Sequence, residues 1–301
     1  MRVLVSGATG LVGAALSESL RRDGHEAARL ARPAGEARAG DVRWDPVQGE
    51  FDGAAAEGAD AVVHLAGASI ADGRWNETRK RVLRSSRVEA TRHLVAALAT
   101  LKKAPKTLVS ASAIGYYGDR GEELLTEESA PGGDFLAQLA RDWEAAATGA
   151  EQSQIRTVIL RFGVILAAHG GALAKMLTPF KLGVGGKIGT GQQWMSWLTL
   201  GEAVGLIRYA LETTGLRGAV NAVSPAPVRN CDFTRALGTA LHRPTIFPMP
   251  AFVARAAFGE MADALLLSSQ RVVPRRLETA GYHFRAPELG AALRDVLSQG
   301  K

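Results

Sequence analysis

A glycine-rich loop near the N-terminus constrains the fold of this chain more than any other feature. Residues 2–5 form an apolar, strand-like run, and residues 11–22 carry apolar side chains at helical spacing. Between them lie three glycines spaced three residues apart, Gly7, Gly10 and Gly13. A strand, a glycine-rich turn and a helix in this order are typical of the first βα unit of a dinucleotide-binding domain. The alternative is a structural turn with incidental glycines, which explains the spacing less well.

The three glycines are expected to have different tasks. Gly7 permits a tight turn, Gly10 lets the backbone approach a diphosphate, and Gly13 lets the helix pack closely on the sheet. The N-terminus of the helix presents free N–H groups and a partial positive charge to the phosphates. We therefore expect this loop to bind a dinucleotide. The expected contact residues are Gly7, Thr9, Gly10, Leu11, Val12 and Gly13.

The end of the second expected strand, residues 27–32, indicates which dinucleotide is bound. An acid at this position would bond the ribose 2′-hydroxyl of NAD and repel a 2′-phosphate. The chain has Arg32 there and no acid. A guanidinium can pair with a 2′-phosphate through two hydrogen bonds. The sequence therefore predicts NADP(H) as cofactor, and an ordinary surface role for Arg32 is the alternative.

Strand-like and helix-like segments alternate through the first half of the chain. Further strands are expected at 61–66, 107–111 and 157–166, and long helices at 79–101 and 135–150. Strands that are separated by helices pair in parallel. The fold class predicted is α/β, a Rossmann-type doubly wound parallel sheet.

The pattern changes after residue 166, where glycines become frequent and the expected elements become short. We expect residues 1–166 to form the NADP-binding domain, with its sheet completed by residues 196–224. Residues 167–301 would form a smaller C-terminal lobe on the substrate side, over the carboxyl ends of the strands.

Composition disfavours several classes of protein. There is no apolar window long enough to span a membrane. The single cysteine, Cys231, excludes an internal disulfide and fits the cytoplasm, where we expect the protein to act. The net charge is +6, but acidic residues are dispersed among the basic ones, so no nucleic-acid partner is expected. The expected partner is a small-molecule substrate; its identity and the oligomeric state stay open.

Short motifs along nearly the whole chain resemble those of one enzyme family. They include residues 6–13 (SGATGLVG), 64–67 (HLAG), 110–118 (SASAIGYYG), 160–163 (LRFG) and 221–225 (NAVSP). Together they resemble an extended, atypical short-chain dehydrogenase/reductase of the NAD-dependent epimerase/dehydratase superfamily. Within that superfamily the chain is similar to the branch called epimerase family proteins or cell-division inhibitor homologues.

The resemblance implies roles for residues outside the glycine loop. Further cofactor contacts are implied for Leu65, Ala66, Gly67, Arg87 and Arg161. Arg87 stands where extended members usually carry an asparagine. Ser112 matches the serine that hydrogen-bonds a substrate carbonyl or hydroxyl. For His64, a buried strand position is favoured over a catalytic role.

The family's usual acid/base pair is missing. Standard members carry Tyr-x-x-x-Lys on the helix after the serine, with the tyrosine as proton donor. In one register these positions hold Leu136 and Ala140, and in the other they hold Phe135 and Leu139. An apolar side chain cannot transfer a proton. The usual pair is therefore absent in either register.

Two tyrosines near Ser112 are the remaining candidates for proton donor. Tyr116 and Tyr117 follow the serine in the same motif, and both have pocket lining or packing as an alternative role. Two functions stay open. The first is an NADP(H)-dependent epimerase or reductase that acts on a small polar or nucleotide-linked substrate. The second is a non-catalytic NADP(H)-binding regulator or redox sensor.

Overall fold

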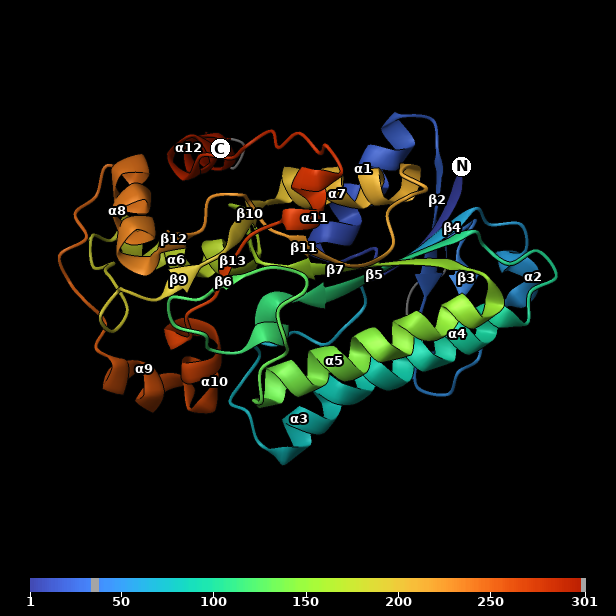
Figure 1. Ribbon diagram of the computed structural model, residues 1–301, viewed down its shortest axis with the longest axis horizontal. Coiled ribbons are helices and arrows are strands. Elements are labelled where there is room, and N and C mark those ends of the chain that lie inside the picture. Colours follow the sequence, from blue (N-terminus) through green and yellow to red (C-terminus); the bar gives the residue numbers. More distant parts are fainter. Residues whose placement is uncertain (34–37, 299–301) are drawn as a thin grey trace.

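A parallel sheet forms the centre of the protein in the computed structural model, which describes residues 1–33 and 38–298 (Figure 1). Within these residues the sheet has seven strands in the order β11-β7-β5-β4-β1-β2-β3, and each adjacent pair is parallel. The strands are Arg2–Ser6 (β1), Glu26–Ala31 (β2), Val42–Arg43 (β3), Ala61–His64 (β4), Thr107–Ala113 (β5), Arg156–Phe162 (β7) and Gly218–Ala222 (β11). The Rossmann-type doubly wound α/β fold predicted from the sequence is confirmed.

The strand order reverses between β1 and β4. From β1 the chain first adds β2 and β3 on one side, and then adds β4, β5, β7 and β11 on the other. Ligands of doubly wound folds bind at the carboxyl ends of the strands at such a reversal. The glycine loop follows β1 directly, so the topology places it at this point.

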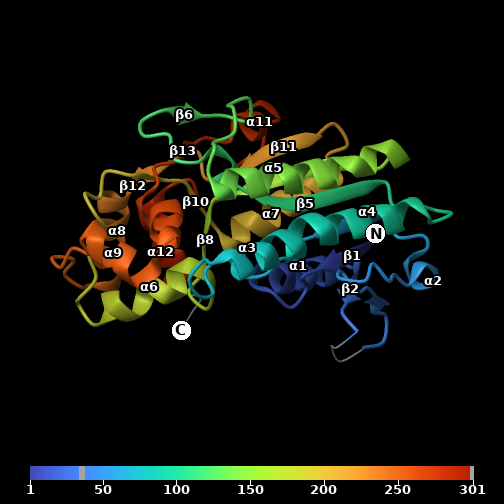
Figure 2. The same ribbon diagram turned by 90° about the horizontal axis from the view of Figure 1, so that it is seen from below.

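Helices cover both faces of the sheet (Figures 1 and 2). Helices α1 (Leu11–Arg22) and α7 (Leu200–Glu212) lie side by side on one face, and α4 (Ala90–Ala99) and α5 (Phe135–Thr148) cover the other. A short helix, α2 (Gly53–Ala56), precedes β4. Two 3₁₀ segments, η2 (Ile114–Tyr117) and η3 (Gly149–Ser153), follow β5 and α5.

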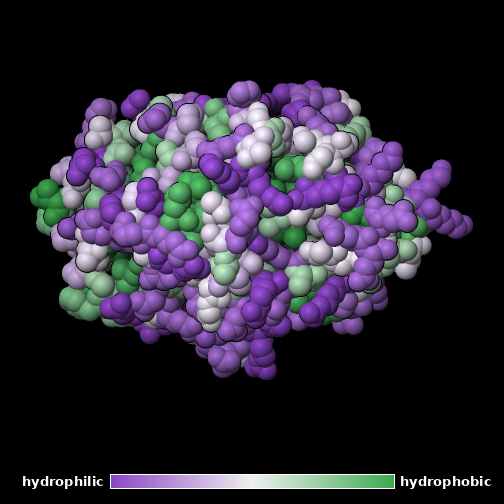
Figure 3. All heavy atoms as spheres, viewed as in Figure 1, coloured by the Kyte–Doolittle hydropathy of each residue, from purple (hydrophilic) through white to green (hydrophobic). Residues whose placement is uncertain are grey.

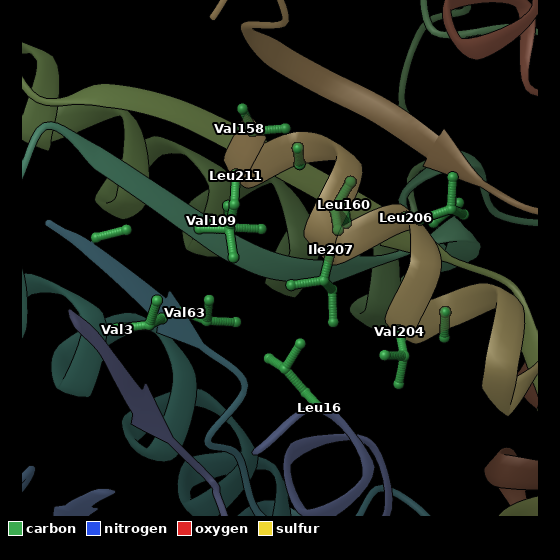
Figure 4. Close-up of a cluster of buried hydrophobic side chains, with 14 of the residues drawn as sticks. Val3, Leu16, Val63, Val109, Val158, Leu160, Val204, Leu206, Ile207 and Leu211 are labelled. Carbon is green, nitrogen blue, oxygen red and sulfur yellow. The ribbon is translucent and has the colours of Figure 1, made fainter. Parts of the chain in front are cut away.

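Alternation of side chains along the strands divides the core into two layers. Val3 of β1 lies in one apolar cluster with Leu16 of α1 and Ile207 of α7 (Figure 4), and Val5 belongs to the same cluster. Leu4 points the opposite way into the cluster that includes residues of α4. Burying one such aliphatic side chain contributes roughly 1.5–3 kcal/mol. The near-continuous apolar runs of these strands reflect a sheet covered on both faces.

The helix expected at 79–101 is continuous but not uniform. It consists of α3 (Glu77–Arg84), a π-helical segment η1 (Ser85–Glu89) and α4. The side chain of Asn76 caps its start by accepting from the Arg79 N–H at 2.8 Å. Such π turns are rare and frequently lie at functional sites.

The strand expected at 157–166 is interrupted, which corrects the sequence-based boundary. β7 ends at Phe162, and β8 (Val164–Leu166) pairs instead with β10 (Trp197–Thr199). Between them a Cβ on Gly163 would lie 2.5 Å from the carbonyl oxygen of Ser196. The chain therefore leaves the main sheet where another backbone segment crosses closely.

The remainder of the C-terminal half consists of short elements. The helices are α6 (Gly171–Lys181), α8 (Asn230–Leu241), α9 (Ala251–Phe258), α10 (Glu260–Ala262), the π segment η4 (Asp263–Leu267), α11 (Arg275–Thr279) and α12 (Leu289–Ser298). Two small strand pairs join distant segments: β6 (Leu124–Leu125) with β13 (Arg271–Val272), and β9 (Trp194–Met195) with β12 (Val228–Arg229). Residues of α6, α8 and α12 share a third apolar core.

The surface seen in Figure 3 is largely hydrophilic, with apolar residues more frequent toward the end where α8 and α9 lie. Over residues 1–33 and 38–298, no helix is long and apolar enough to cross a membrane.

Candidate functional site

The glycine loop lies at the carboxyl end of β1, and its three glycines have different surroundings. Gly7 has a φ of +67°, and a Cβ there would lie 3.0 Å from the backbone of Leu65 and Ala66. A Cβ on Gly13 would lie 2.2 Å from the carbonyl oxygen of Gly7. A Cβ on Gly10 would meet only that same oxygen, at 3.2 Å, and Gly10 is exposed. The fold therefore requires Gly7 and Gly13, whereas Gly10 leaves its backbone open to a ligand.

The first turn of α1 presents backbone N–H groups without a capping side chain. Its N-cap residue, Gly10, provides no side-chain hydrogen bond, and the first turn holds no acidic residue. Helices α3, α5 and α7, by contrast, each begin with a side-chain cap. Thr9 is exposed beside this turn, and Leu11 and Val12 are half-buried. An anion bound here would accept hydrogen bonds from groups that have no partner within the helix.

A buried hydrogen-bond chain holds the segment after β4 against the glycine loop. Ser6 Oγ accepts from the backbone N–H groups of Leu65 at 3.1 Å and Ala66 at 3.2 Å, and it lies 2.6 Å from His64 Nδ1. Because this hydroxyl already accepts twice, it donates to Nδ1, which leaves the ring neutral with its proton on Nε2. Burial lowers the pKa of His64 to about 4, in agreement with a neutral ring. The prediction of a buried strand histidine is confirmed, since His64 is 0% exposed.

The same chain continues into the helices that cover the sheet. His64 Nε2 donates to Thr91 Oγ1 at 3.0 Å, which also accepts from Trp143 Nε1 at 3.0 Å. Thr91 in turn donates to the carbonyl oxygen of Arg87 at 2.5 Å. The Arg87 guanidinium lies 5.3 Å from the centre of the Trp143 ring, and its Cζ is 3.2 Å from where a Cβ on Gly67 would be. The structure thus places Arg87 directly beside the loop that follows β4.

Ser112 lies at the carboxyl end of β5 in a second buried network. Its Oγ donates to Glu144 Oε1 at 2.6 Å. Arg161 donates to the two Glu144 oxygens from Nε and Nη2, each at 2.8 Å, in a bidentate ion pair. Its Nη1 donates to the Tyr117 hydroxyl at 2.9 Å, and that hydroxyl donates to Asn221 Oδ1 at 2.7 Å. Strand register brings these groups together, because Ser112 lies opposite Arg161, which lies opposite Asn221.

These contacts place three of the expected site residues inside the protein, since Ser112 is only 3% exposed, as Arg161 is. The resemblance implies a cofactor contact for Arg161, but its side chain is 3% exposed and its guanidinium is engaged with Glu144 and Tyr117. Tyr117 is 0% exposed, and its hydroxyl has two internal partners. Burial raises the pKa of Tyr117 to about 12, against the opposing effect of Arg161. A hydroxyl in this position is poorly placed to give a proton to a bound molecule.

Tyr116 differs from its neighbour in having an uncommitted hydroxyl. The side chain is half-buried, and its ring centre lies 3.5 Å from Arg161 Cζ and 5.2 Å from the ring centre of Tyr117. Its hydroxyl forms no hydrogen bond with any residue in the described part of the chain. Of the two tyrosines expected near Ser112, Tyr116 is the one left available.

The structure also decides which register of α5 faces the site. Leu136, Ala140 and Glu144 are four residues apart and share one face of the helix. Glu144 on this face reaches Ser112, so Leu136 and Ala140 occupy the positions of the family's tyrosine and lysine. Both are buried, and a Cβ on Gly115 would touch Leu136 at 3.4 Å. The usual acid/base positions are filled by packed apolar side chains.

A cavity of about 280 Å³ opens between the start of α5 and the C-terminal half. It is lined by Trp75, Asp119, Asp134, Phe135, Leu136, Arg255, Glu260, Asp263, Ala264, Leu267 and Ser268. Two of the four carboxylates are paired, Glu260 with Lys80 at 2.7 Å and Asp263 with Arg255 at 2.9 Å. Within the described residues no group of His, Cys, Asp and Glu side chains could hold a metal ion. The wall of the cavity therefore combines apolar side chains with carboxylates, two of which are neutralised by ion pairs.

Arg32 lies immediately after β2, where the sequence predicts the residue that distinguishes NADP from NAD. It is exposed, and the residues that follow at 34–37 lie outside the described part of the chain. β2 ends at Ala31, so no acidic residue occupies its carboxyl end, and the contact of Arg32 with a 2′-phosphate stays a prediction.

Comparison with known proteins identifies two family models in the sequence. The model described as the NAD dependent epimerase/dehydratase family matches residues 3–222, and a domain of unknown function matches residues 249–296. An epimerase family protein of Mycobacterium tuberculosis is 43% identical over 291 residues, which are 97% of this chain and 96% of that protein. The human epimerase family protein SDR39U1 is 39% identical over 305 residues, covering 99% and 100% of the two chains.

Solved structures agree with these relatives. The crystal structure of human SDR39U1 with NADPH superposes with a TM-score of 0.91 at 37% identity, covering 99% of each chain. A nucleoside-diphosphate sugar epimerase from Corynebacterium glutamicum superposes with a TM-score of 0.83 at 36% identity, covering 99% of this chain and 58% of that one.

Proposed function

This chain belongs to the NAD-dependent epimerase/dehydratase family, and from that premise we propose that it binds NADP(H) and acts as an epimerase- or reductase-like enzyme without the usual tyrosine and lysine. The observation that carries the proposal is the glycine loop at the switch point of the sheet. Gly7 and Gly13 are required by close backbone contacts, while Gly10 and the uncapped first turn of α1 face outward.

The residues present fit this cofactor. The N–H groups of the first turn of α1 would hold the diphosphate, and Arg32 would pair with the 2′-phosphate. Leu65, Ala66 and Gly67 would line the path toward the nicotinamide. Human SDR39U1, crystallised with NADPH, supports the choice of cofactor. When bound, NADP(H) supplies or accepts a hydride at its nicotinamide ring.

The chemistry of this chain would depend on Ser112 and Tyr116. Ser112 lies at the end of β5 with its hydroxyl proton donated to Glu144, so it would hydrogen-bond a substrate hydroxyl through its oxygen lone pair. Tyr116 would supply the proton, because its hydroxyl is free while that of Tyr117 is bonded to Asn221 and Arg161. Proton transfer by a positioned group contributes about 10²–10⁴ in rate.

A substrate would enter through the cavity beside Leu136; Ser112 and Tyr116 lie beyond the residues that line it. We propose a small polar substrate for this cavity, because carboxylates form part of its wall. We propose that the protein works on such a molecule in the cytoplasm, without a nucleic-acid or membrane partner.

The second candidate is a non-catalytic NADP(H)-binding regulator or redox sensor. One observation favours it: the positions of the family's acid and base are occupied by the buried apolar residues Leu136 and Ala140. A protein of this kind would bind NADPH tightly and turn over nothing.

A turnover screen distinguishes the two candidates. The purified protein is incubated with NADPH and a panel of small carbonyl compounds, and with NADP⁺ and the matching alcohols. Net oxidation or reduction is followed by NADPH absorbance, and epimerisation, which leaves the cofactor unchanged overall, by NMR of the compounds. The enzyme proposal expects at least one compound whose turnover depends on Ser112. Tight NADPH binding with no turnover across the panel favours the regulator.

A further inference from the structure

Two arginines on one helix face the same short loop beside the glycine loop. Arg79 on α3 and Arg87 on η1 are eight residues apart. In a regular α-helix, residues seven apart share a face. A π turn absorbs one extra residue, so it brings residues eight apart toward the same face. The helix irregularity thus brings both arginines to the face of the helix that meets this loop.

Both guanidinium groups contact the segment 67–69 that follows β4. Arg79 Nη2 donates to the carbonyl oxygen of Ser69, and Arg87 lies against Gly67. The loop is also tied to the helix, since the Ala68 N–H donates to Ser86 Oγ at 3.1 Å. Leu65 and Ala66, which precede this segment, lie against Gly7. The two arginines are therefore next to the expected path of the cofactor.

The two cations have no counter-ion within residues 1–33 and 38–298. Neither forms an ion pair there, and Arg79 Nε is buried without a hydrogen-bond partner. The side-chain hydrogen bond of Arg87 is a weak one, from Nη1 to the carbonyl oxygen of Leu83 at 3.4 Å. Their neighbour Arg84, by contrast, pairs with Asp142 at 2.7 Å.

Electrostatics makes this arrangement unfavourable unless an anion is bound. Burial lowers the pKa of Arg87 to about 10, and the positive charge of Arg79 adds to the effect. A charge that is removed from water is normally paired with an opposite charge. A second positive charge nearby increases the free-energy cost of burying the first. Trp143 orients the Arg87 guanidinium and Ser69 orients that of Arg79, which leaves both placed to bind an oxyanion.

We propose that Arg79 and Arg87 form an oxyanion-binding site on the loop 67–69. The ligand is a phosphate or carboxylate group, carried either by the cofactor or by an acidic substrate. The cofactor source rests on the proposed NADP(H) binding, whereas the site itself does not. Sequence motifs point to Arg87 alone; Arg79 is identified by the helix geometry.

The test compares Arg79→Gln and Arg87→Gln with Arg84→Gln, a matched control on the same helix whose charge is already paired. NADPH affinity is measured by titration, and thermal unfolding is followed with inorganic phosphate, in the presence and absence of saturating NADPH. Without any anion, Arg87→Gln should melt no lower than the unmodified protein, because it removes a desolvated charge. If Arg87→Gln does not fold, the same measurements on Arg79→Gln alone test the proposal.

We expect phosphate to stabilise the unmodified protein and Arg84→Gln, and both site variants to lose at least half of that shift. If NADPH affinity also falls about tenfold or more, and phosphate adds nothing to the NADPH-saturated protein, the anion is a cofactor phosphate. If NADPH affinity is unchanged and phosphate still stabilises the saturated protein through these arginines, the anion belongs to the substrate.

The site is disproved if both variants match Arg84→Gln in NADPH affinity and in phosphate stabilisation. Failure of the proposed function gives a different result: the unmodified protein binds no NADPH, yet phosphate stabilises it and the two variants lose that effect. That outcome supports the site and removes the cofactor as its ligand.

Discussion

Arg32 is the residue on which the choice between NADPH and NADH depends. It is exposed directly after β2, so its loss should not disturb the fold. A charge-assisted hydrogen bond to a 2′-phosphate is worth about 1.5–3 kcal/mol, or roughly ten- to a hundredfold in affinity. Titration should show that Arg32→Ala loses this factor for NADPH and none for NADH. The control is Arg22→Ala, which removes an arginine from the end of α1 that lies away from the glycine loop. Equal NADPH affinity of the two variants would contradict the assignment of Arg32 to the 2′-phosphate.

Ser112 and Tyr116 are the residues on which catalysis would depend. Once a substrate is found, Ser112→Ala and Tyr116→Phe should each slow hydride transfer by about a hundredfold or more, because each removes a group that we propose to act at the reacting oxygen. NADPH affinity should stay constant in both. Tyr209→Phe, which removes only a surface hydrogen bond to Ala280, is the control. Normal turnover by the Ser112 and Tyr116 variants would reject these roles.

Roles of single residues were the hardest part to predict from sequence. The buried state of His64 follows from its place in an apolar strand, and the loss of the family's tyrosine and lysine is visible in the helix sequence. The internal pairing of Arg161 with Glu144 depends on contacts between β7 and α5 that no local pattern encodes. Arg161 therefore matches a motif and also takes part in an internal ion pair, and its contact with the cofactor stays a prediction.

The glycine loop as an element combines a folding requirement with a binding requirement, and two substitutions separate them. Gly13→Ala places a Cβ 2.2 Å from the carbonyl oxygen of Gly7, and overpacking of this kind costs about 1–3 kcal/mol. Gly10→Val adds a side chain that faces outward. We expect Gly13→Ala to lower the melting temperature, and Gly10→Val to lose NADPH binding with little change in melting. Normal binding by a folded Gly10→Val protein would show that the loop is not the phosphate site.

The chain from Ser6 through His64 to Thr91 links β1, β4 and α4, and it makes stability depend on pH. The pKa of His64 is about 4 in the folded protein, against an ordinary value of 6.5 for a solvated histidine, so the unfolded chain binds a proton that the native protein does not. Stability is therefore full above pH 6.5 and falls as the pH decreases toward 4. The expected loss between pH 7 and pH 5 is about 2 kcal/mol.

Chemical unfolding at the two pH values measures this contribution. His64→Gln cannot titrate, so its free energy of unfolding should lose about 2 kcal/mol less than that of the unmodified protein over the same interval. Equal losses in the two proteins would mean that another group is responsible.

The regular elements of the first half were predictable because their patterns are local. The helix over residues 11–22 and the strands that begin at 2, 61 and 107 agree with apolar runs and helical spacing. The π segment in the helix after residue 77 was not predictable, because the apolar period of the sequence does not show a single added residue. The two-residue strand β3 was too short to give a pattern.

At the scale of the whole molecule, the switch point of the sheet brings the glycine loop, the loop after β4 and Ser112 to one edge. The C-terminal half then covers part of that edge with short elements. Their placement depends on distant partners, such as β13 on β6 and Tyr282 on Glu202, and therefore could not be derived from sequence alone.

A titration of the unmodified protein with NADPH and with NADH tests the central claim most directly. The account predicts saturable binding of one NADPH per chain, at least tenfold tighter than NADH. It also predicts that NADPH at a hundred times its Kd stabilises the protein by about 2.7 kcal/mol against unfolding. Absence of saturable NADPH binding, or equal affinity for the two cofactors, would contradict it.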